Sequence, residues 1–159
     1  MTLHRKVLTS IAGVFFLTSL VSPAVSYSHQ YQQSFKVFLP GWDLFVQGLL
    51  LSIMGIVTLD FGAIWRCLPW FGNLLFVVAT VHFMRGLDRR ATVFSFLAAV
   101  CMLFYAIEPS AFPTERVGGG LAEEAVQVQR GYFFWLSAPA VVFVASVTLL
   151  ISKAGDRRP

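Results

Sequence analysis

Charged side chains are scarce in this chain. Of its 159 residues, only 13% are Asp, Glu, Lys or Arg, whereas 57% are hydrophobic. A soluble globular protein needs more polar surface than this composition supplies, so several apolar stretches must face lipid. The sequence therefore predicts a single membrane domain, residues 1–159, built as an all-α helical bundle.

Residues that carry out chemistry are equally rare. The two cysteines, Cys67 and Cys101, fit neither a disulfide framework nor a metal site, and we interpret both as packing residues. No cluster of His, Cys and carboxylate residues has the spacing of metal ligands, and no nucleophile has a base beside it. We therefore expect no metal, no cofactor and no enzymatic activity.

Basic residues outnumber acidic ones, and the net charge is +4. They lie in small clusters at the ends of apolar stretches, where residues that orient a membrane protein are normally found. This placement indicates membrane topology and argues against nucleic-acid binding. The lipid bilayer is the first partner that we expect.

The first apolar stretch, residues 7–21, follows Arg5 and Lys6 and ends at a Ser-Pro-Ala step. Residues 1–26 fit a secretory signal cleaved before Tyr27, and they are also long enough for a first spanning helix. We favour the retained helix because the apolar stretch is longer than the core of a typical signal. Both interpretations leave Arg5 and Lys6 in the cytoplasm.

Residues 41–66 decide the topology. If residues 44–64 and 68–84 both cross, seven basic residues lie outside and five inside, which inverts the positive-inside rule. If 41–66 is re-entrant or interfacial, eight lie inside and four outside. Charge thus favours cytoplasmic termini, one extra segment at 41–66, and four spanning helices at residues 1–26, 68–84, 91–107 and 132–152. An ordinary spanning helix over 44–64 stays open.

The segment 41–66 has two further features. Gly48, Gly55 and Gly62 recur every seven residues, so on one helix they form a smooth face for close packing. Asp43 and Asp60 flank the apolar part. An ionised carboxylate at mid-bilayer costs at least about 2.5 kcal/mol, so we expect both at an interface.

Several polar or amphipathic residues are candidates for function. Trp70 suits the aromatic belt at a membrane boundary, and Arg66 can pair with Asp60. Asn73 lies one turn into the next helix, where its amide can bridge to a neighbouring helix. His82 is a candidate because an ionisable residue within a membrane helix is a functional hypothesis by default, although its place close to the cytoplasmic interface favours a structural role.

Residues 108–130 are predicted to form an external acidic loop. The glycine triplet at 118–120 lacks the Lys and Ser/Thr pattern of a phosphate-binding loop. Within the loop, residues 121–129 predict a short helix with Leu121, Ala125 and Val128 on one face.

Three short motifs occur in the order of a known family. Gly41-Trp42 follows the first helix, Trp70-Phe71-Gly72-Asn73 enters the next, and Gly131-Tyr132-Phe133-Phe134-Trp135 starts the last. With the Pro23-Ala24 step, they resemble a family of small, uncharacterised bacterial inner-membrane proteins. The chain departs from the family pattern at Gly72, where alanine is usual, and at Leu74, where proline is usual. The resemblance implies a multi-pass protein of the bacterial inner (cytoplasmic) membrane and brings no activity.

Two functions are open. We favour a structural or accessory subunit, whose small-residue faces pack against a second copy or a larger membrane-protein partner. The alternative is a small transporter or channel-like protein with a polar path at Asp60, Arg66 and Asn73.

Overall fold

The computed structural model describes residues 3–28, 36–107 and 125–155. Most of these residues are helical. The helices are α1 (Leu3–Val21), α2 (Gly41–Thr58), α3 (Phe61–Arg66), α4 (Leu68–Met84), α5 (Asp88–Ile107) and α6 (Arg130–Gly155), and the strands are β1 (Pro23–Ser28), β2 (Lys36–Pro40) and β3 (Ala125–Val128).

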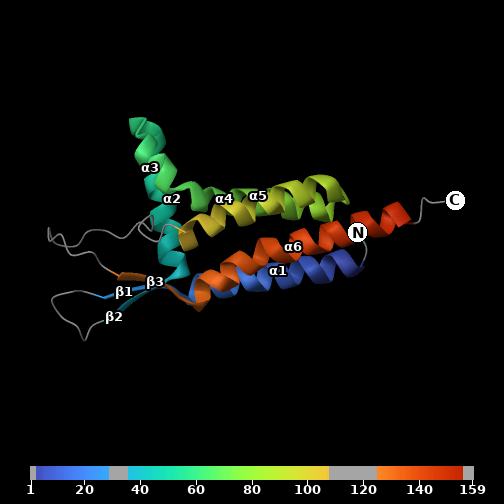
Figure 1. Ribbon diagram of the computed structural model, residues 1–159, viewed down its shortest axis with the longest axis horizontal. Coiled ribbons are helices and arrows are strands. Elements are labelled where there is room, and N and C mark those ends of the chain that lie inside the picture. Colours follow the sequence, from blue (N-terminus) through green and yellow to red (C-terminus); the bar gives the residue numbers. More distant parts are fainter. Residues whose placement is uncertain (1–2, 29–35, 108–124, 156–159) are drawn as a thin grey trace.

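The body of the molecule is a bundle of α1, α4, α5 and α6, which run alongside one another (Figure 1). Helix α4 pairs with α5, α1 pairs with α6, and α5 joins the two pairs by packing against α6. Small buried residues such as Ala79, Ala98, Ala138 and Ser95 lie along these contacts. Their size lets the helix backbones approach closely, as is typical of helices that pack within a membrane.

Helices α2 and α3 lie across one end of the bundle instead of along it (Figure 1). Helix α2 ends at Thr58. The next residue, Leu59, has a left-handed φ of 53°, and the Asp60 amide donates to Gly55 O at 3.0 Å. A left-handed residue terminates a helix because the next amide can then reach back to an unpaired carbonyl. The opposite end of the bundle holds the start of α1, the end of α6 and the turn between α4 and α5.

Besides the helices, which hold most of the described residues, the chain has a short three-stranded sheet that the all-α prediction does not include. β1 pairs antiparallel with β2 on one side and with β3 on the other, giving the order β2-β1-β3. Val25 lies opposite Leu39 in one pairing and opposite Val128 in the other. The predicted helix at 121–129 is therefore wrong for residues 125–128, which bond to the open edge of β1. Residues 108–124 of the predicted external loop lie outside the described residues.

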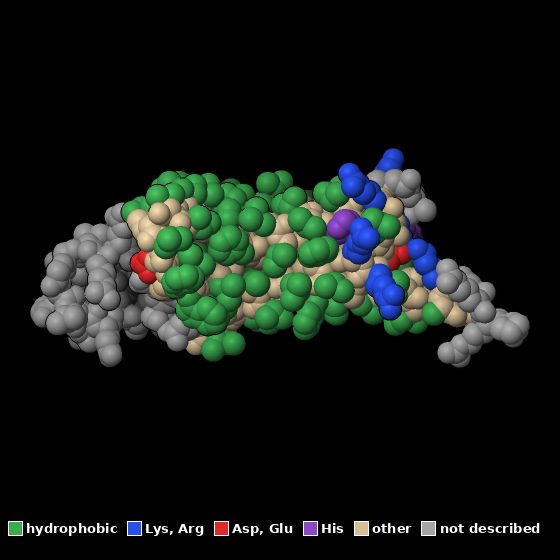
Figure 2. Space-filling model, turned by 90° about the horizontal axis from the view of Figure 1, so that it is seen from above, with side chains coloured by type: hydrophobic (Ala, Val, Ile, Leu, Met, Phe, Trp, Pro, Cys, Tyr) green, Lys and Arg blue, Asp and Glu red, His purple; other side chains and the backbone are tan. Residues whose placement is uncertain are grey.

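Three of the described helices, α2, α5 and α6, are long and apolar enough to cross a membrane, and α4 is a shorter apolar helix. Hydrophobic side chains cover the middle of the molecule, whereas Lys and Arg gather at one end (Figure 2). These features make the chain a helical membrane protein. Length and composition do not by themselves give the number of crossings, because α2 meets both criteria and yet lies across the bundle.

Candidate functional site

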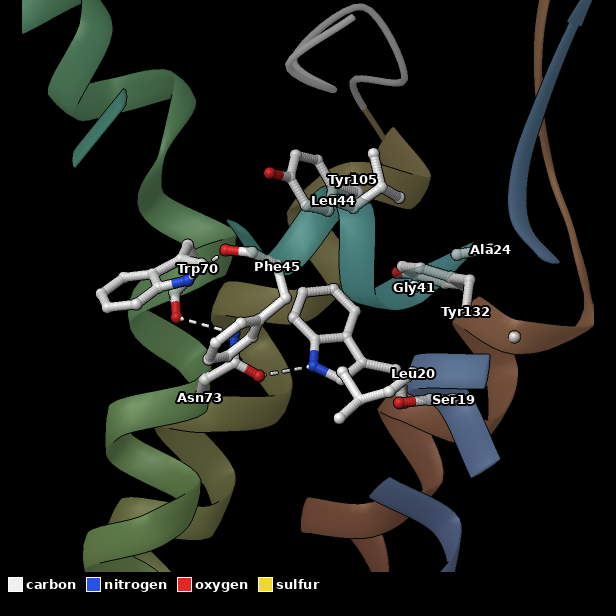
Figure 3. A pocket seen from close by; sticks show the side chains of 12 residues that line it. Ser19, Leu20, Ala24, Gly41, Leu44, Phe45, Trp70, Asn73, Tyr105 and Tyr132 are labelled. Atoms are coloured by element: carbon white, nitrogen blue, oxygen red, sulfur yellow. Dashed lines mark hydrogen bonds between the residues drawn. The ribbon is translucent and has the colours of Figure 1, made fainter. Parts of the chain in front are cut away.

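A small cavity lies where α2 crosses the end of the bundle (Figure 3). Its volume is about 40 Å³, and residues of α1, β1, α2, α4, α5 and α6 line it. A cavity needs about 10–15 Å³ to hold one water molecule, so this one has room for a few. Pockets for small-molecule ligands are roughly 300–1,000 Å³, which excludes this cavity as it stands from binding an ordinary substrate.

Asn73 of α4 is the polar centre of the cavity. Trp135 Nε1 donates to Asn73 Oδ1 at 2.7 Å, and Asn73 Nδ2 donates to Trp70 O at 3.0 Å. Trp70 Nε1 in turn donates to Phe45 O at 3.0 Å, so the series of bonds runs from α6 through α4 to α2 (Figure 3). Both ends of the Asn73 amide are therefore paired although the residue is only 5% exposed. A buried polar group needs such partners because desolvating it without them is costly.

Three glycines permit the close approach of elements around the cavity. A Cβ atom at Gly41 would collide with the carbonyl oxygen of Ser19, and one at Gly131 would lie 2.6 Å from Pro23 O. A Cβ atom at Gly48 would lie 2.8 Å from Cδ1 of Trp70. Any larger residue would push α2 or α6 outwards. These three positions therefore require glycine, which has no side chain.

The motifs that carry the family resemblance meet at this cavity. Gly41 comes from the first motif, Trp70 and Asn73 from the second, and Tyr132 and Trp135 from the third. Tyr132 adds a further tie, because its hydroxyl donates to Met102 O at 2.8 Å in the interior. The motifs thus hold α2, α4, α5 and α6 together.

The predicted polar path is not assembled in the described part of the chain. Asp60 is exposed in the turn between α2 and α3, where its Oδ1 accepts from the Gly62 amide at 2.9 Å. Asn73 lies under the start of α2, beside Phe45. The length of helix between Phe45 and the turn that holds Asp60 is about 20 Å, at a rise of 1.5 Å per residue. Arg66 ends α3, and its side chain is outside the described part.

The glycine face is real over part of its predicted length. Gly48 and Gly55 are buried together with Ser52, whose Oγ donates to Gly48 O at 2.7 Å. Gly62 is exposed in α3 and does not continue this face, because the turn at Leu59 separates the two helices. The seven-residue spacing therefore predicts a packing face only as far as α2 extends, and Gly48 packs against Trp70 of the same chain and not against a second copy or a partner.

His82 lies near the other end of the bundle. Its ring stacks on Phe94 with centroids 5.4 Å apart, and its Nδ1 is buried without a hydrogen-bond partner among the described residues. It does not reach Asn73, since the two residues lie two and a half turns, or roughly 13 Å, apart along α4.

A buried cluster of charges was missed by the sequence analysis. Asp88 at the start of α5 lies 2.6 Å from both Arg5 Nη1 of α1 and Lys153 Nζ of α6, and its side chain is 2% exposed. Arg5 Nη1 also donates to Phe83 O at 2.6 Å, and the guanidinium lies 4.9 Å from the Phe83 ring centroid. The sequence does show that each of these residues is a charge next to an apolar stretch. It does not show which of them pair, because they are far apart in the sequence.

In the part of the chain that the structure describes, no group of three or more His, Cys, Asp or Glu residues could hold a metal ion. The resemblance to small inner-membrane proteins stays a prediction. Comparisons of the chain with protein-family models, with curated proteins and with solved structures found no match.

Proposed function

We propose that this protein is a structural or accessory subunit that docks a transmembrane helix, of a larger membrane partner or of a second copy, on the outer face of α2. The observation that carries this proposal is an exposed apolar stripe. Val46, Leu50, Ile53 and Val57 are 43%, 56%, 51% and 77% exposed.

The stripe faces away from the bundle. Gly48, Ser52 and Gly55 are the buried residues of α2, and the spacing of 3.6 residues per turn puts the stripe on the opposite side of the helix. A helix that rests at a membrane surface normally turns polar residues towards water. The outer face of α2 instead needs an apolar cover.

A protein cover fits the position of α2 better than lipid alone. The helix lies across the end of the bundle that also carries the sheet β2-β1-β3, where the spanning helices end (Figure 1). At this level the surroundings change from hydrocarbon to headgroups and water, so lipid tails cannot enclose the whole stripe. A partner helix laid along α2 would enclose it.

The same arrangement supports a topology of four crossings, by α1, α4, α5 and α6, in the bacterial inner membrane with cytoplasmic termini. The basic residues at the bundle end that holds both termini favour the cytoplasm under the positive-inside rule (Figure 2). Retention of α1 is supported by its ion pair with Asp88 and by Ala12, which is fully buried in the core. The alternative of a small transporter has less support, because Asp60 and Asn73 lie apart and the cavity is small.

Thiol cross-linking in native membranes tests the docking face. In a chain with Cys67 and Cys101 replaced by alanine, Leu50→Cys and Val57→Cys should each give one cross-linked species of defined mass with a short bifunctional maleimide. Val144→Cys on α6 is the matched control, since Val144 is 62% exposed on a helix of the bundle body. A monodisperse monomer in mild detergent, with no cross-linked species from either α2 position, would contradict the proposal.

A further inference from the structure

Helices α4 and α5 form an open groove at the basic end of the bundle. The groove has a volume of about 450 Å³ and is lined by His82, Arg89, Arg90, Val93 and Phe94. The two arginines supply positive charge at one part of the groove, and Val93 and Phe94 supply an apolar part further along α5. The stack of the His82 ring on Phe94 joins the two helices at the groove.

The positive charge of the groove is not neutralised by the described part of the chain. The side chains of Arg89 and Arg90 are exposed and make no ion pair or hydrogen bond with the described residues. The neighbouring carboxylate, Asp88, is buried between Arg5 and Lys153. Its charge is therefore used inside the bundle, and the guanidinium groups are available to an anion from outside.

The place of the groove specifies the kind of anion. Lys and Arg side chains gather where the apolar surface of the bundle ends (Figure 2). On a membrane protein this boundary lies at the level of the lipid headgroups, so the nearest anions are phosphates that carry acyl chains. Val93 is 53% exposed and Phe96, one turn further along α5, is also 53% exposed, so an apolar surface for such a chain continues towards the bilayer centre.

We propose that this groove binds the headgroup of an anionic phospholipid, with Arg89 and Arg90 on the phosphate and an acyl chain along Val93 and Phe94. Guanidinium groups suit this role because their planar donors match phosphate oxygens in pairs. Basic pockets between membrane helices on the cytoplasmic side are known to select anionic lipids. The site is separate from the docking face of α2, which lies at the other end of the bundle (Figure 1).

Native mass spectrometry of the full chain in mild detergent tests this site. The protein is titrated with phosphatidylglycerol and, separately, with phosphatidylcholine that has the same acyl chains. The double variant Arg89→Gln/Arg90→Gln should bind phosphatidylglycerol roughly 25-fold more weakly, since each basic residue near a membrane surface contributes about a fivefold effect. The variant should keep its fold because both side chains are exposed and unpaired in the described structure.

The control variant is Lys6→Gln/Arg85→Gln, which removes two exposed charges from the same end without touching the groove. It should bind phosphatidylglycerol with an affinity within about twofold of that of the natural chain. The two charges that it lacks act on the lipid only through the screened electrostatic field at that end of the bundle. Equal weakening of both double variants would overturn the groove as the site. Equal binding of the two lipids by the natural chain would overturn selection of an anionic headgroup. Displacement of the lipid by inorganic phosphate at millimolar concentration would assign the groove to a soluble anion instead.

Discussion

The amide of Asn73 connects two tryptophans that come from different helices. It accepts from Trp135 Nε1 and donates to Trp70 O, and it is buried. Replacement by leucine, of similar size, would leave the indole N–H of the half-buried Trp135 without its acceptor. Leaving a buried donor unsatisfied costs about 1–3 kcal/mol.

We therefore expect Asn73→Leu to lower the free energy of unfolding by about 1–3 kcal/mol, measured by denaturant titration in detergent. Thr80→Val on the same helix is the control. Thr80 bonds only to Phe76 O within α4, so its loss should cost less than Asn73→Leu. Equal effects of the two variants would show that the Asn73 bonds do not hold α4 to α6.

Asp88 carries the second residue-level prediction. Removal of one partner from a buried ion pair leaves an uncompensated charge and costs about 3–5 kcal/mol. Asp88→Asn should therefore destabilise the fold by about that amount, because the side chain of Arg5 is only 9% exposed and loses its counterion. Lys153→Gln should cost at most about 1 kcal/mol, since the side chain of Lys153 is 54% exposed.

The double variant Arg5→Leu/Asp88→Leu separates charge pairing from mere packing. Without either buried charge, it should be more stable than Asp88→Asn alone, because a buried ion pair replaced as a whole is often tolerated. The three variants are compared by their unfolding free energies in the same detergent. If the double variant were the least stable of the set, the ion pair would not explain the effect of Asp88→Asn.

At the scale of elements, the packing of α2 against Trp70 of α4 depends on Gly48. A Cβ atom there would lie 2.8 Å from Trp70 Cδ1, which real contacts essentially never show. We expect Gly48→Ala to force the Trp70 indole or α2 to move, with a loss of about 1–3 kcal/mol, typical of overpacking. Gly13→Ala in α1 is the matched control because nothing lies within 4 Å of its added Cβ.

Gly13→Ala should be neutral or slightly stabilising, since alanine in a helix interior is favoured over glycine by about 0.5–1 kcal/mol. Both variants are measured by thermal unfolding in detergent, with tryptophan fluorescence as the readout. A Gly48→Ala protein as stable as the natural chain would mean that α2 does not rest on Trp70.

Some of these elements could be predicted from the sequence and others could not. The helix Leu68–Met84 begins and ends where the pattern of Pro69 and the basic turn indicates, and the α2 packing face follows from the Gly48 and Gly55 spacing. β3 could not be predicted, because Ala-Val-Gln-Val fits a helix turn locally and becomes a strand only by pairing with β1, about a hundred positions earlier. Local propensity does not contain that pairing.

The candidate site shows the same division. The sequence predicts that Asn73 bridges to another helix, because an amide one turn into an apolar helix needs a partner. It does not identify Trp135, whose indole reaches Asn73 only once α6 has packed into the bundle. Arg5 and Asp88 are likewise 83 positions apart in the sequence, and only the packing of the bundle brings them to 2.6 Å. Long-range pairing, not residue type, is what the sequence alone left open.

At the scale of the whole molecule, the orientation of α2 decides the topology of everything after it. With the start of α1 in the cytoplasm, a crosswise α2 leaves Asp60 outside, and α4 then carries Leu87 to the cytoplasm. If α2 crossed instead, Asp60 would lie in the cytoplasm and Leu87 outside. The two topologies therefore exchange the sides of both positions at once.

Two cysteine variants in the background without Cys67 and Cys101 distinguish these topologies. Asp60→Cys and Leu87→Cys both place the thiol at an exposed position, since Asp60 is exposed and Leu87 is 42% exposed. A membrane-impermeant maleimide added to intact cells should label Asp60→Cys, and should label Leu87→Cys only after the membrane is permeabilised. The reverse pattern would mean either that α2 spans the bilayer or that the whole bundle is inverted, with both termini outside. Because the basic residues at the end with Leu87 would then face outwards against the positive-inside rule, that result would also remove the charge argument for cytoplasmic termini.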